Sequence, residues 1–239
     1  MRSTRMTRMA AVFHLVAAML FVAAPFATPG FDGFEPAQFP VPVENPPVQP
    51  AGWAFAIWGL IYLWLLAGAG FGLFARHDSA DWAAMRWPLI GSLVLGAAWL
   101  GVAQTAPVSA TGLIWAMLAL ALWSLARTGE QDRLWQRSPV ALYAGWLTAA
   151  ACVGSGIVLA GYGLATPQTA ALIFLALALA LAVTVALALP RAPEYVAGVI
   201  WALAGVIAAN LSPVNPAVLV LASAGILVLA GTTWLRRAP

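Results

Sequence analysis

Charge is scarce in this chain of 239 residues. Only 8% of the residues are charged, lysine is absent, and 63% are hydrophobic. A soluble domain carries about 25% charged residues, so this chain lacks the polar side chains that a water-exposed surface requires. We therefore expect an integral membrane protein. The net charge of +3 comes from basic residues that are dispersed rather than clustered, which argues against nucleic-acid binding.

Cysteine and histidine are almost absent. The single Cys152 excludes a disulfide within the chain, and we interpret it as a small buried hydrophobe. His14 has no second histidine or cysteine at ligand spacing, so it is interpreted as a packing residue rather than a metal or haem ligand. No Ser-His-Asp arrangement, zinc motif, P-loop or dinucleotide fingerprint can be assembled. We expect no enzymatic activity, no metal site and no required cofactor.

Eight apolar stretches remain when the chain is cut at charges and Pro/Gly clusters. Each is close to the ~20 residues with which a helix crosses a bilayer core of ~30 Å, although the fourth and seventh are short. The period-two alternation of barrel strands is absent. The predicted fold is an all-α membrane bundle of eight transmembrane helices. The predicted ranges are 9–27, 52–75, 88–105, 110–126, 139–161, 168–189, 194–210 and 214–235.

The arginines predict the orientation of this bundle. All eleven basic residues lie at the termini or in every second connection, and the loop 28–51 carries only the acidic Asp32, Glu35 and Glu44. By the positive-inside rule both termini are cytoplasmic and this loop faces outward. The arginines are Arg2, Arg5, Arg8, Arg76, Arg86, Arg127, Arg133, Arg137, Arg191, Arg236 and Arg237.

No acidic or basic residue is expected deep inside a predicted helix, which argues against an ion-driven pump or an ion channel. The start of the chain has two interpretations, a cleavable signal peptide or a retained first helix. Its apolar run of about 19 residues is longer than a usual signal core, so we expect a retained helix.

Tryptophan is abundant, with twelve residues. Four of them lie beside the predicted membrane boundaries, where an indole keeps its ring apolar and its N–H hydrated, and are interpreted as interfacial. They are Trp82, Trp87, Trp135 and Trp234.

Other aromatic residues lie deeper in the predicted helices. Phe55, Trp58 and Tyr62 are spaced i, i+3, i+7, so they share one face of the second helix. Such a face can line a slot for a flat apolar ligand, or it can be ordinary helix packing, and the spacing leaves both interpretations open. Candidate partners on the third, fourth and fifth helices are Trp99, Trp115, Tyr143 and Trp146.

The stretch "NPPVQPAGWAFAIWGLIY" (45–62) resembles the signature of the TspO/MBR family, the tryptophan-rich sensory proteins related to the mitochondrial translocator protein. "SPVALYAGWLTAAA" (138–151) is similar to the last core helix of that family. The resemblance covers 9–163 and is closest to a longer branch with extra C-terminal helices. It implies a five-helix bundle over 1–163 and a three-helix extension over 164–239. The signature matches are Asn45, Pro46, Pro47, Trp53, Phe55, Trp58 and Tyr62.

Members of this family bind porphyrins, haem-like tetrapyrroles and, in some cases, cholesterol or lipids. The resemblance therefore implies a sensor or regulator in a bacterial inner membrane, with a tetrapyrrole or other flat apolar ligand and possible homodimers or membrane-protein partners. The alternatives are a transporter of a neutral or amphipathic small molecule and a scaffold subunit of a membrane complex. The implied pocket residues are Trp53, Phe55, Trp58, Tyr62, Trp99, Trp115, Tyr143 and Trp146, beneath a lid that contains Asn45, Pro46 and Pro47.

Residue counting gives one geometric expectation for this pocket. Trp58 lies a few residues below the outer boundary of its predicted helix, and Trp146 lies a few residues above the inner boundary of its own. At 1.5 Å per residue, their levels in a ~30 Å core are on the order of 12 Å apart.

Overall fold

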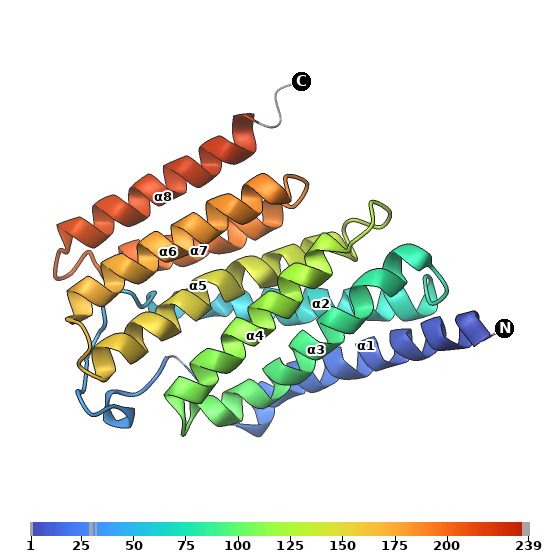
Figure 1. The fold of residues 1–239 in the computed structure, drawn as a ribbon, viewed down its shortest axis with the longest axis horizontal. Helices are drawn as coiled ribbons and strands as arrows, with labels where there is room; N and C mark the ends of the chain where they lie inside the picture. The colour runs from blue at the N-terminus through green and yellow to red at the C-terminus, as the bar shows by residue number, and fades with distance from the viewer. Residues whose placement is uncertain (1, 29–30, 32, 236–239) are drawn as a thin grey trace.

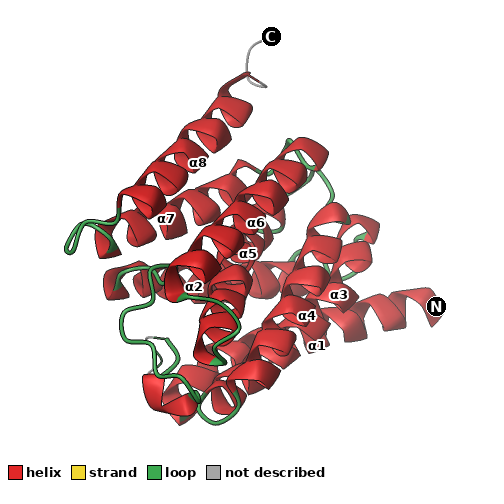
Figure 2. Cartoon of the chain, turned by 60° about the vertical axis from the view of Figure 1, so that its left-hand side comes forward, coloured by secondary structure: helices red, strands yellow, loops and turns green. Residues whose placement is uncertain are grey.

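The computed structural model describes residues 2–28, 31 and 33–235, which fold into eight α-helices and two short 3-10 turns (Figures 1 and 2). Asp32, Arg236 and Arg237, which contributed to the predicted orientation, lie outside the described residues. The helices are α1 (Arg2–Ala27), α2 (Ile57–Phe74), α3 (Ala80–Ala103), α4 (Pro107–Ala126), α5 (Arg137–Gly161), α6 (Pro167–Ala188), α7 (Pro193–Ala209) and α8 (Pro216–Leu235). The 3-10 turns are η1 (Pro36–Gln38) and η2 (Gly52–Ala56).

Helix length and composition confirm the prediction of an all-α integral membrane protein. Seven of the described helices are long and apolar enough to cross a membrane, counting α2 together with the 3-10 turn before it. The seventh helix in the chain, α7, is apolar but has only 17 residues. At about 1.5 Å per residue it is slightly shorter than a ~30 Å hydrocarbon core, as its sequence predicted.

α5 is the central helix and is buried along most of its length. It packs against α2 and α4 on one side and against α6 and α7 on the other. α1 and α3 complete the first group and α8 packs on α6 and α7, so α5 separates the two groups in Figure 1. The described part of the long loop, residues 33–51, winds over one end of the bundle (Figure 2).

Two glycines let α5 and α7 cross with their backbones in contact. A Cβ atom on Gly145 would overlap the carbonyl oxygen of Tyr195, and one on Gly198 would lie 2.9 Å from the carbonyl oxygen of Leu142. Small residues at helix crossings allow this close approach in membranes, where packing rather than the hydrophobic effect holds helices together. α7 is therefore an integral part of the bundle.

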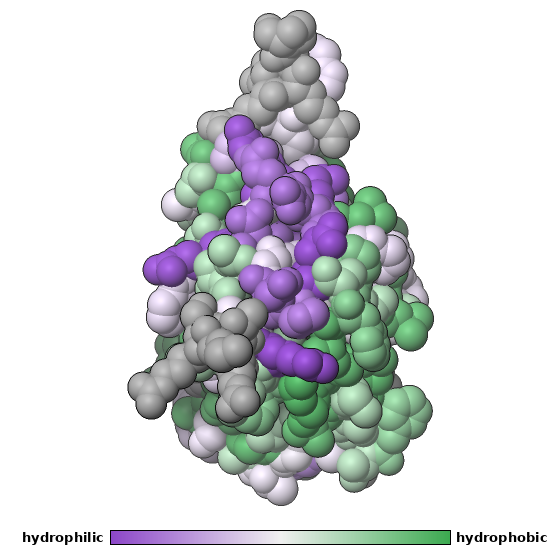
Figure 3. Space-filling model, turned by 90° about the vertical axis from the view of Figure 1, so that its right-hand side faces the viewer, coloured by the Kyte–Doolittle hydropathy of each residue, from purple (hydrophilic) through white to green (hydrophobic). Residues whose placement is uncertain are grey.

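Hydrophilic residues gather at the end of the bundle opposite the long loop (Figure 3), and because the ion pairs lie there we call it the charged end. Arg76 pairs with Asp132 at 2.7 Å, which joins the α2–α3 and α4–α5 connections. Arg133 pairs with Glu194 at the start of α7 at 2.6 Å. Arg191 pairs with Glu130. The alternation of arginine-bearing connections along the chain thus becomes one charged surface, and the opposite end is called the lid end.

α3 begins at Ala80, eight residues before the predicted start at 88, and this places Arg86 inside a helix. The side chain of Arg86 is fully buried. Its guanidinium donates to the carbonyl oxygens of Gly72 at 2.9 Å and Arg76 at 2.8 Å. Carbonyls at a helix C-terminus lack partners within the helix and carry partial negative charge, so they stabilise this cation. The prediction that Arg86 lies in the connection between the second and third helices is therefore wrong.

Trp82 also differs from its interpretation as an interfacial residue. Its side chain is fully buried, and its indole N–H donates to the carboxylate of Asp132 at 3.2 Å. By contrast, Trp87, Trp135 and Trp234 are exposed. Trp82 therefore holds the connection before α5 onto α3 rather than facing the membrane boundary.

Candidate functional site

Aromatic side chains from α1, α2 and α5 meet around Trp58. Its ring stacks on Tyr62, with centroids 5.3 Å apart, and meets Trp146 edge-on at 6.0 Å. Phe55 meets Trp146 edge-on at 5.8 Å, and Phe21 of α1 meets Tyr62 at 4.9 Å. Edge-to-face and offset contacts of this kind are the preferred geometries of aromatic pairs. The face predicted from the spacing in α2 is therefore joined to α5 in one cluster.

The 6.0 Å separation of Trp58 and Trp146 shows that the expected depth difference, on the order of 12 Å, is wrong. Two departures from ideal helix counting explain the error. Gly52–Ala56 is a 3-10 turn, which rises about 2.0 Å per residue and carries Trp58 deeper. α5 begins at Arg137 rather than at 139, so Trp146 lies further along its helix.

The 3-10 turn η2 is held by α7 rather than by a capping side chain of its own. The backbone N–H of Ala51 donates to the carbonyl oxygen of Gly205 at 3.0 Å. The indole N–H of Trp201 donates to the carbonyl oxygen of Ala54 at 2.7 Å. The first bond satisfies a backbone N–H at the start of the turn, and the second gives the carbonyl oxygen of Ala54 another donor besides the N–H of Ile57.

Two cavities lie at the lid end beneath the long loop and share five wall residues. The larger has a volume of about 320 Å³ and the smaller about 50 Å³. Tyr62 borders only the larger cavity, while Trp146, Thr111 and Ala150 border only the smaller one. The shared walls are Phe31, Phe55, Trp58, Trp99 and Ile114.

Three of the residues assigned to the pocket from the sequence do not line these cavities. Tyr143 is fully buried among the helices. Trp115 donates its indole N–H to the hydroxyl of Ser155 at 2.9 Å, between α4 and α5. Trp53 is half exposed and packs edge-on against Trp201 of α7, with centroids 5.1 Å apart. The other five assigned residues, Phe55, Trp58, Tyr62, Trp99 and Trp146, border one or both cavities.

The lid contacts the cavities through residues that the sequence did not single out. Phe31, Gln49 and Pro50 border the cavities, whereas Asn45, Pro46 and Pro47 do not. The sequence offered one indication that Gln49 and Pro50 border the cavities, which is that they directly precede the aromatic helix.

Asn45, Pro46 and Pro47 instead shape the loop. Asn45 has a φ of +49°, a left-handed conformation that Asn adopts more readily than most residues. The carbonyl oxygen of Pro47 accepts a 2.9 Å hydrogen bond from the side chain of Asn210, at the end of α7. These residues therefore fix the course of the lid from outside the cavity wall.

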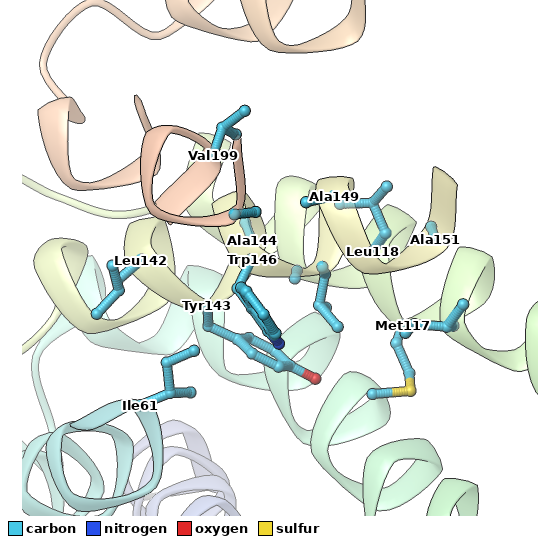
Figure 4. Close-up of a cluster of buried hydrophobic side chains, with 14 of the residues drawn as sticks. Ile61, Met117, Leu118, Leu142, Tyr143, Ala144, Trp146, Ala149, Ala151 and Val199 are labelled. Atoms are coloured by element: carbon cyan, nitrogen blue, oxygen red, sulfur yellow. The ribbon is translucent and has the colours of Figure 1, made fainter. Parts of the chain in front are cut away.

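Two buried polar atoms of residues that border the smaller cavity have no hydrogen-bond partner. They are the indole nitrogen of Trp146, whose side chain is buried, and the hydroxyl oxygen of Thr111. Figure 4 shows the side chains of Trp146 and Tyr143 close together in the buried cluster. By contrast, the indole N–H of Trp99 is satisfied by the carbonyl oxygen of Ala110 at 2.8 Å. The site can thus offer one N–H donor and one hydroxyl within an aromatic wall.

The part of the chain that the structure describes contains no cluster of side chains suited to bind a metal ion. In residues 2–28, 31 and 33–235, no three His, Cys, Asp or Glu side chains gather closely enough to hold an ion.

Comparison with known proteins gives one match. A family model described as "TSPO-like protein" matches residues 9–235. No curated protein and no solved structure gives a significant match. The family match extends from α1 through α8, so it continues well past residue 163, where the resemblance carried by the sequence motifs ends.

Proposed function

The chain belongs to the TSPO-like protein family, and we propose that it binds a flat, largely apolar ligand as a membrane sensor or regulator. Family membership by itself indicates a membrane protein of the sensor and ligand-binding kind. The observation that supports the finer proposal is the aromatic-walled cavity at the lid end, with two unpartnered polar atoms beside it. A few placed polar groups in an otherwise apolar concavity are typical of small-molecule sites.

The unpartnered atoms favour one class of ligand. A buried polar group without a partner costs about 1–3 kcal/mol, and a ligand that pairs with it recovers that free energy. An indole N–H is only a donor, so the indole of Trp146 favours a ligand with an acceptor oxygen or nitrogen. The hydroxyl of Thr111 can serve the same acceptor or a neighbouring donor. We therefore propose a fused-ring compound that carries an acceptor on one edge.

A tetrapyrrole has this chemistry but is larger than either cavity. The larger volume of about 320 Å³ is at the lower limit of ordinary ligand pockets, which are about 300–1,000 Å³. A smaller fused-ring compound fits the larger cavity, but Trp146 and Thr111 border only the smaller one, so pairing with them requires the shared aromatic wall to move. A whole tetrapyrrole requires the lid to shift as well. The lid is the wall best suited to shift, because it is a loop rather than a packed helix.

We further propose that the charged end is cytoplasmic, in keeping with the positive-inside rule, and that the lid faces the outside of a bacterial inner membrane. The ligand would then arrive from the outer leaflet or from the space beyond it. The proposed activity is binding, and no catalytic step is assigned.

Titration of the purified protein in nanodiscs tests the proposal. We expect protoporphyrin IX, or a smaller fused-ring compound with a carbonyl group, to quench tryptophan fluorescence saturably. Trp146→Phe, which keeps an aromatic ring but removes the indole N–H, should weaken binding. Trp234→Phe is the matched control, because Trp234 is exposed near the end of α8. The proposal is overturned if no compound quenches the wild type while a known porphyrin-binding protein responds in the same assay.

A further inference from the structure

A separate cavity lies at the charged end, far from the lid. It has a volume of about 370 Å³ and lies between the end of α4, the start of α5 and the α6–α7 connection. Leu125 and Thr128 border it from the α4 side, Arg137 from α5, and Leu189 and Arg191 from the α6–α7 connection. Three of its nine wall residues, Thr128, Arg137 and Arg191, are polar or basic, and the rest are apolar.

Arg137 is a fixed cation in this wall. Its Nε donates to the hydroxyl of Thr128 at 3.0 Å, and its Nη2 donates to the carbonyl oxygen of the same residue at 3.1 Å. Thr128 is itself buried. Among the described residues Arg137 has no carboxylate within ion-pair distance, whereas Arg76, Arg133 and Arg191 each have one. The guanidinium is therefore held in place without a carboxylate paired directly to it, and Glu194, which interacts with it electrostatically, is itself paired with Arg133.

The surroundings of Arg137 are also positively charged. Arg191 borders the same cavity and is paired with Glu130. Arg127 immediately precedes Thr128 in the chain, and its guanidinium lies over the ring of Trp123 at 5.8 Å. Arg133 and Glu194 also interact electrostatically with Arg137, and they are paired with each other. Four arginines thus face two acidic side chains, Glu130 and Glu194, so the rim has a surplus of positive charge. A guanidinium matches the oxygens of a phosphate group in charge and geometry.

The apolar part of the cavity indicates what kind of phosphate fits. Trp123 on α4 and Leu187 on α6 are exposed at 53% and 47% in the helical turns next to the cavity. An exposed tryptophan at the end of a membrane helix is typical of the headgroup level of a bilayer. Basic pockets between membrane helices at this level bind anionic lipid headgroups. The apolar surfaces of α4 and α6 then continue from the cavity toward the acyl chains.

We propose that this cavity binds the phosphate of an anionic phospholipid, with Arg137 as its principal ligand. The acyl chains lie along the apolar surfaces of α4 and α6. The lipid bridges the end of α4 and the α6–α7 connection, and so joins the two helix groups on either side of α5. This inference does not depend on the proposed function of the lid-end cavity.

Thermal unfolding with defined lipids tests the proposal. Detergent-solubilised protein is titrated with phosphatidylglycerol, phosphatidylcholine or inorganic phosphate, and the unfolding midpoint is recorded. We expect a saturable rise with phosphatidylglycerol only. Arg137→Gln should lose most of this rise, whereas Arg76→Gln, at the same end but outside the cavity, should keep it. Ala188→Glu provides a second variant that keeps Arg137 and places a carboxylate on the exposed cavity wall.

Each other outcome overturns the proposal. Equal shifts with both lipids would show a non-specific lipid effect, and a full shift with inorganic phosphate would show a free-anion site instead. Equal losses in Arg137→Gln and Arg76→Gln would assign the effect to net charge. If Arg137→Gln does not accumulate, an unchanged phosphatidylglycerol response in Ala188→Glu overturns the proposal.

Discussion

The indole N–H of Trp201 donates a 2.7 Å hydrogen bond to the carbonyl oxygen of Ala54, across 147 positions of the chain. Ala54 belongs to the 3-10 turn that begins the aromatic helix, and Trp201 belongs to α7. Together with the bonds from Ala51 to Gly205 and from Asn210 to Pro47, this contact attaches the last part of the lid to a C-terminal helix. α7 therefore positions the segment that supplies Pro50 and Phe55 to the cavity walls.

Trp201→Phe should lower the stability of the protein. The substitution keeps most of the ring packing on Trp53 but removes the hydrogen bond to Ala54, which is worth about 1 kcal/mol. The midpoint of thermal unfolding in detergent measures the effect. Trp234→Phe is the control, because that side chain is 73% exposed. Equal midpoints in the two variants would contradict a stabilising role for this bond.

Asn210→Ala should loosen the end of the lid near Ala51 and leave the part near Val41 unchanged. Its side chain no longer donates to the carbonyl oxygen of Pro47, so the neighbouring amide of Ala51 should exchange faster with deuterium. The amide of Val41, which donates to the carbonyl oxygen of Gly161, serves as an internal control and should keep its exchange rate. Unchanged exchange at Ala51 would show that Asn210 does not hold the lid.

Gly145→Ala should severely destabilise the bundle. The added Cβ meets the backbone of Tyr195, which cannot move aside as a flexible side chain can, and overpacking of this kind costs about 1–3 kcal/mol or more. Gly112→Ala, at a helical glycine with nothing within 4 Å of the added atom, should be neutral or stabilising by up to ~1 kcal/mol. The yield of folded protein and its unfolding midpoint compare the two. Similar behaviour would rule out a tight α5–α7 crossing.

Thr111→Val should weaken ligand binding without lowering the stability of the protein. Valine keeps the shape of threonine but removes a hydroxyl that has no partner, so the unfolding midpoint should stay the same or rise. The affinity for an acceptor-bearing ligand should fall by up to ~10-fold, which corresponds to about 1.4 kcal/mol. Fluorescence titration measures the affinity. A lower midpoint with unchanged affinity would assign the hydroxyl a purely structural role.

Acid should weaken the charged end through Asp132. Partial burial opposes its ionisation, but hydrogen bonds from Arg76 and Trp82 prevail and lower the pKa of this carboxyl. A carboxyl with a lower pKa in the folded state stabilises the fold at pH values above its unfolded pKa of about 3.9. That stabilisation is lost as the pH falls through the lowered value.

Asp132→Asn should therefore lower the unfolding midpoint at neutral pH and flatten its fall in acid. Glu44→Gln, at an exposed position of the lid, is the comparison. Parallel pH profiles for the wild type and Asp132→Asn would contradict a role for this carboxylate in acid stability.

The helices were predictable from the sequence because charges, Pro and Gly separate the apolar runs clearly. The exception is the first part of α3, where Asp81 and Arg86 count against a membrane helix by hydropathy alone. Arg86 is accommodated because α2 ends beside it. The carbonyl groups at that end accept hydrogen bonds from the guanidinium of Arg86. Such a partner is tertiary, so it has no local signature in residues 80–87.

The cavity wall was predictable where it depends on helical spacing in α2 and on the aromatic residues Trp99 and Trp146 of neighbouring helices. Phe55, Trp58 and Tyr62 lie together because their spacing places them on one face. The 3-10 geometry before α2 and the contribution of Gln49 to the wall depend on α7, which is about 150 residues away in the sequence. Thr111 offers no local signal either, because a threonine in an apolar helix usually bonds within its own helix.

The lid is fastened at several points along its length. Gln38 donates to the carbonyl oxygen of Ala103, Val41 to that of Gly161, and Ala51 to that of Gly205. These contacts divide one long connection into short spans. The conformational entropy of the lid is therefore already lost when the protein folds. A compound that enters the cavity without displacing the lid thus meets an already ordered wall, so little of its binding free energy is lost to ordering that loop.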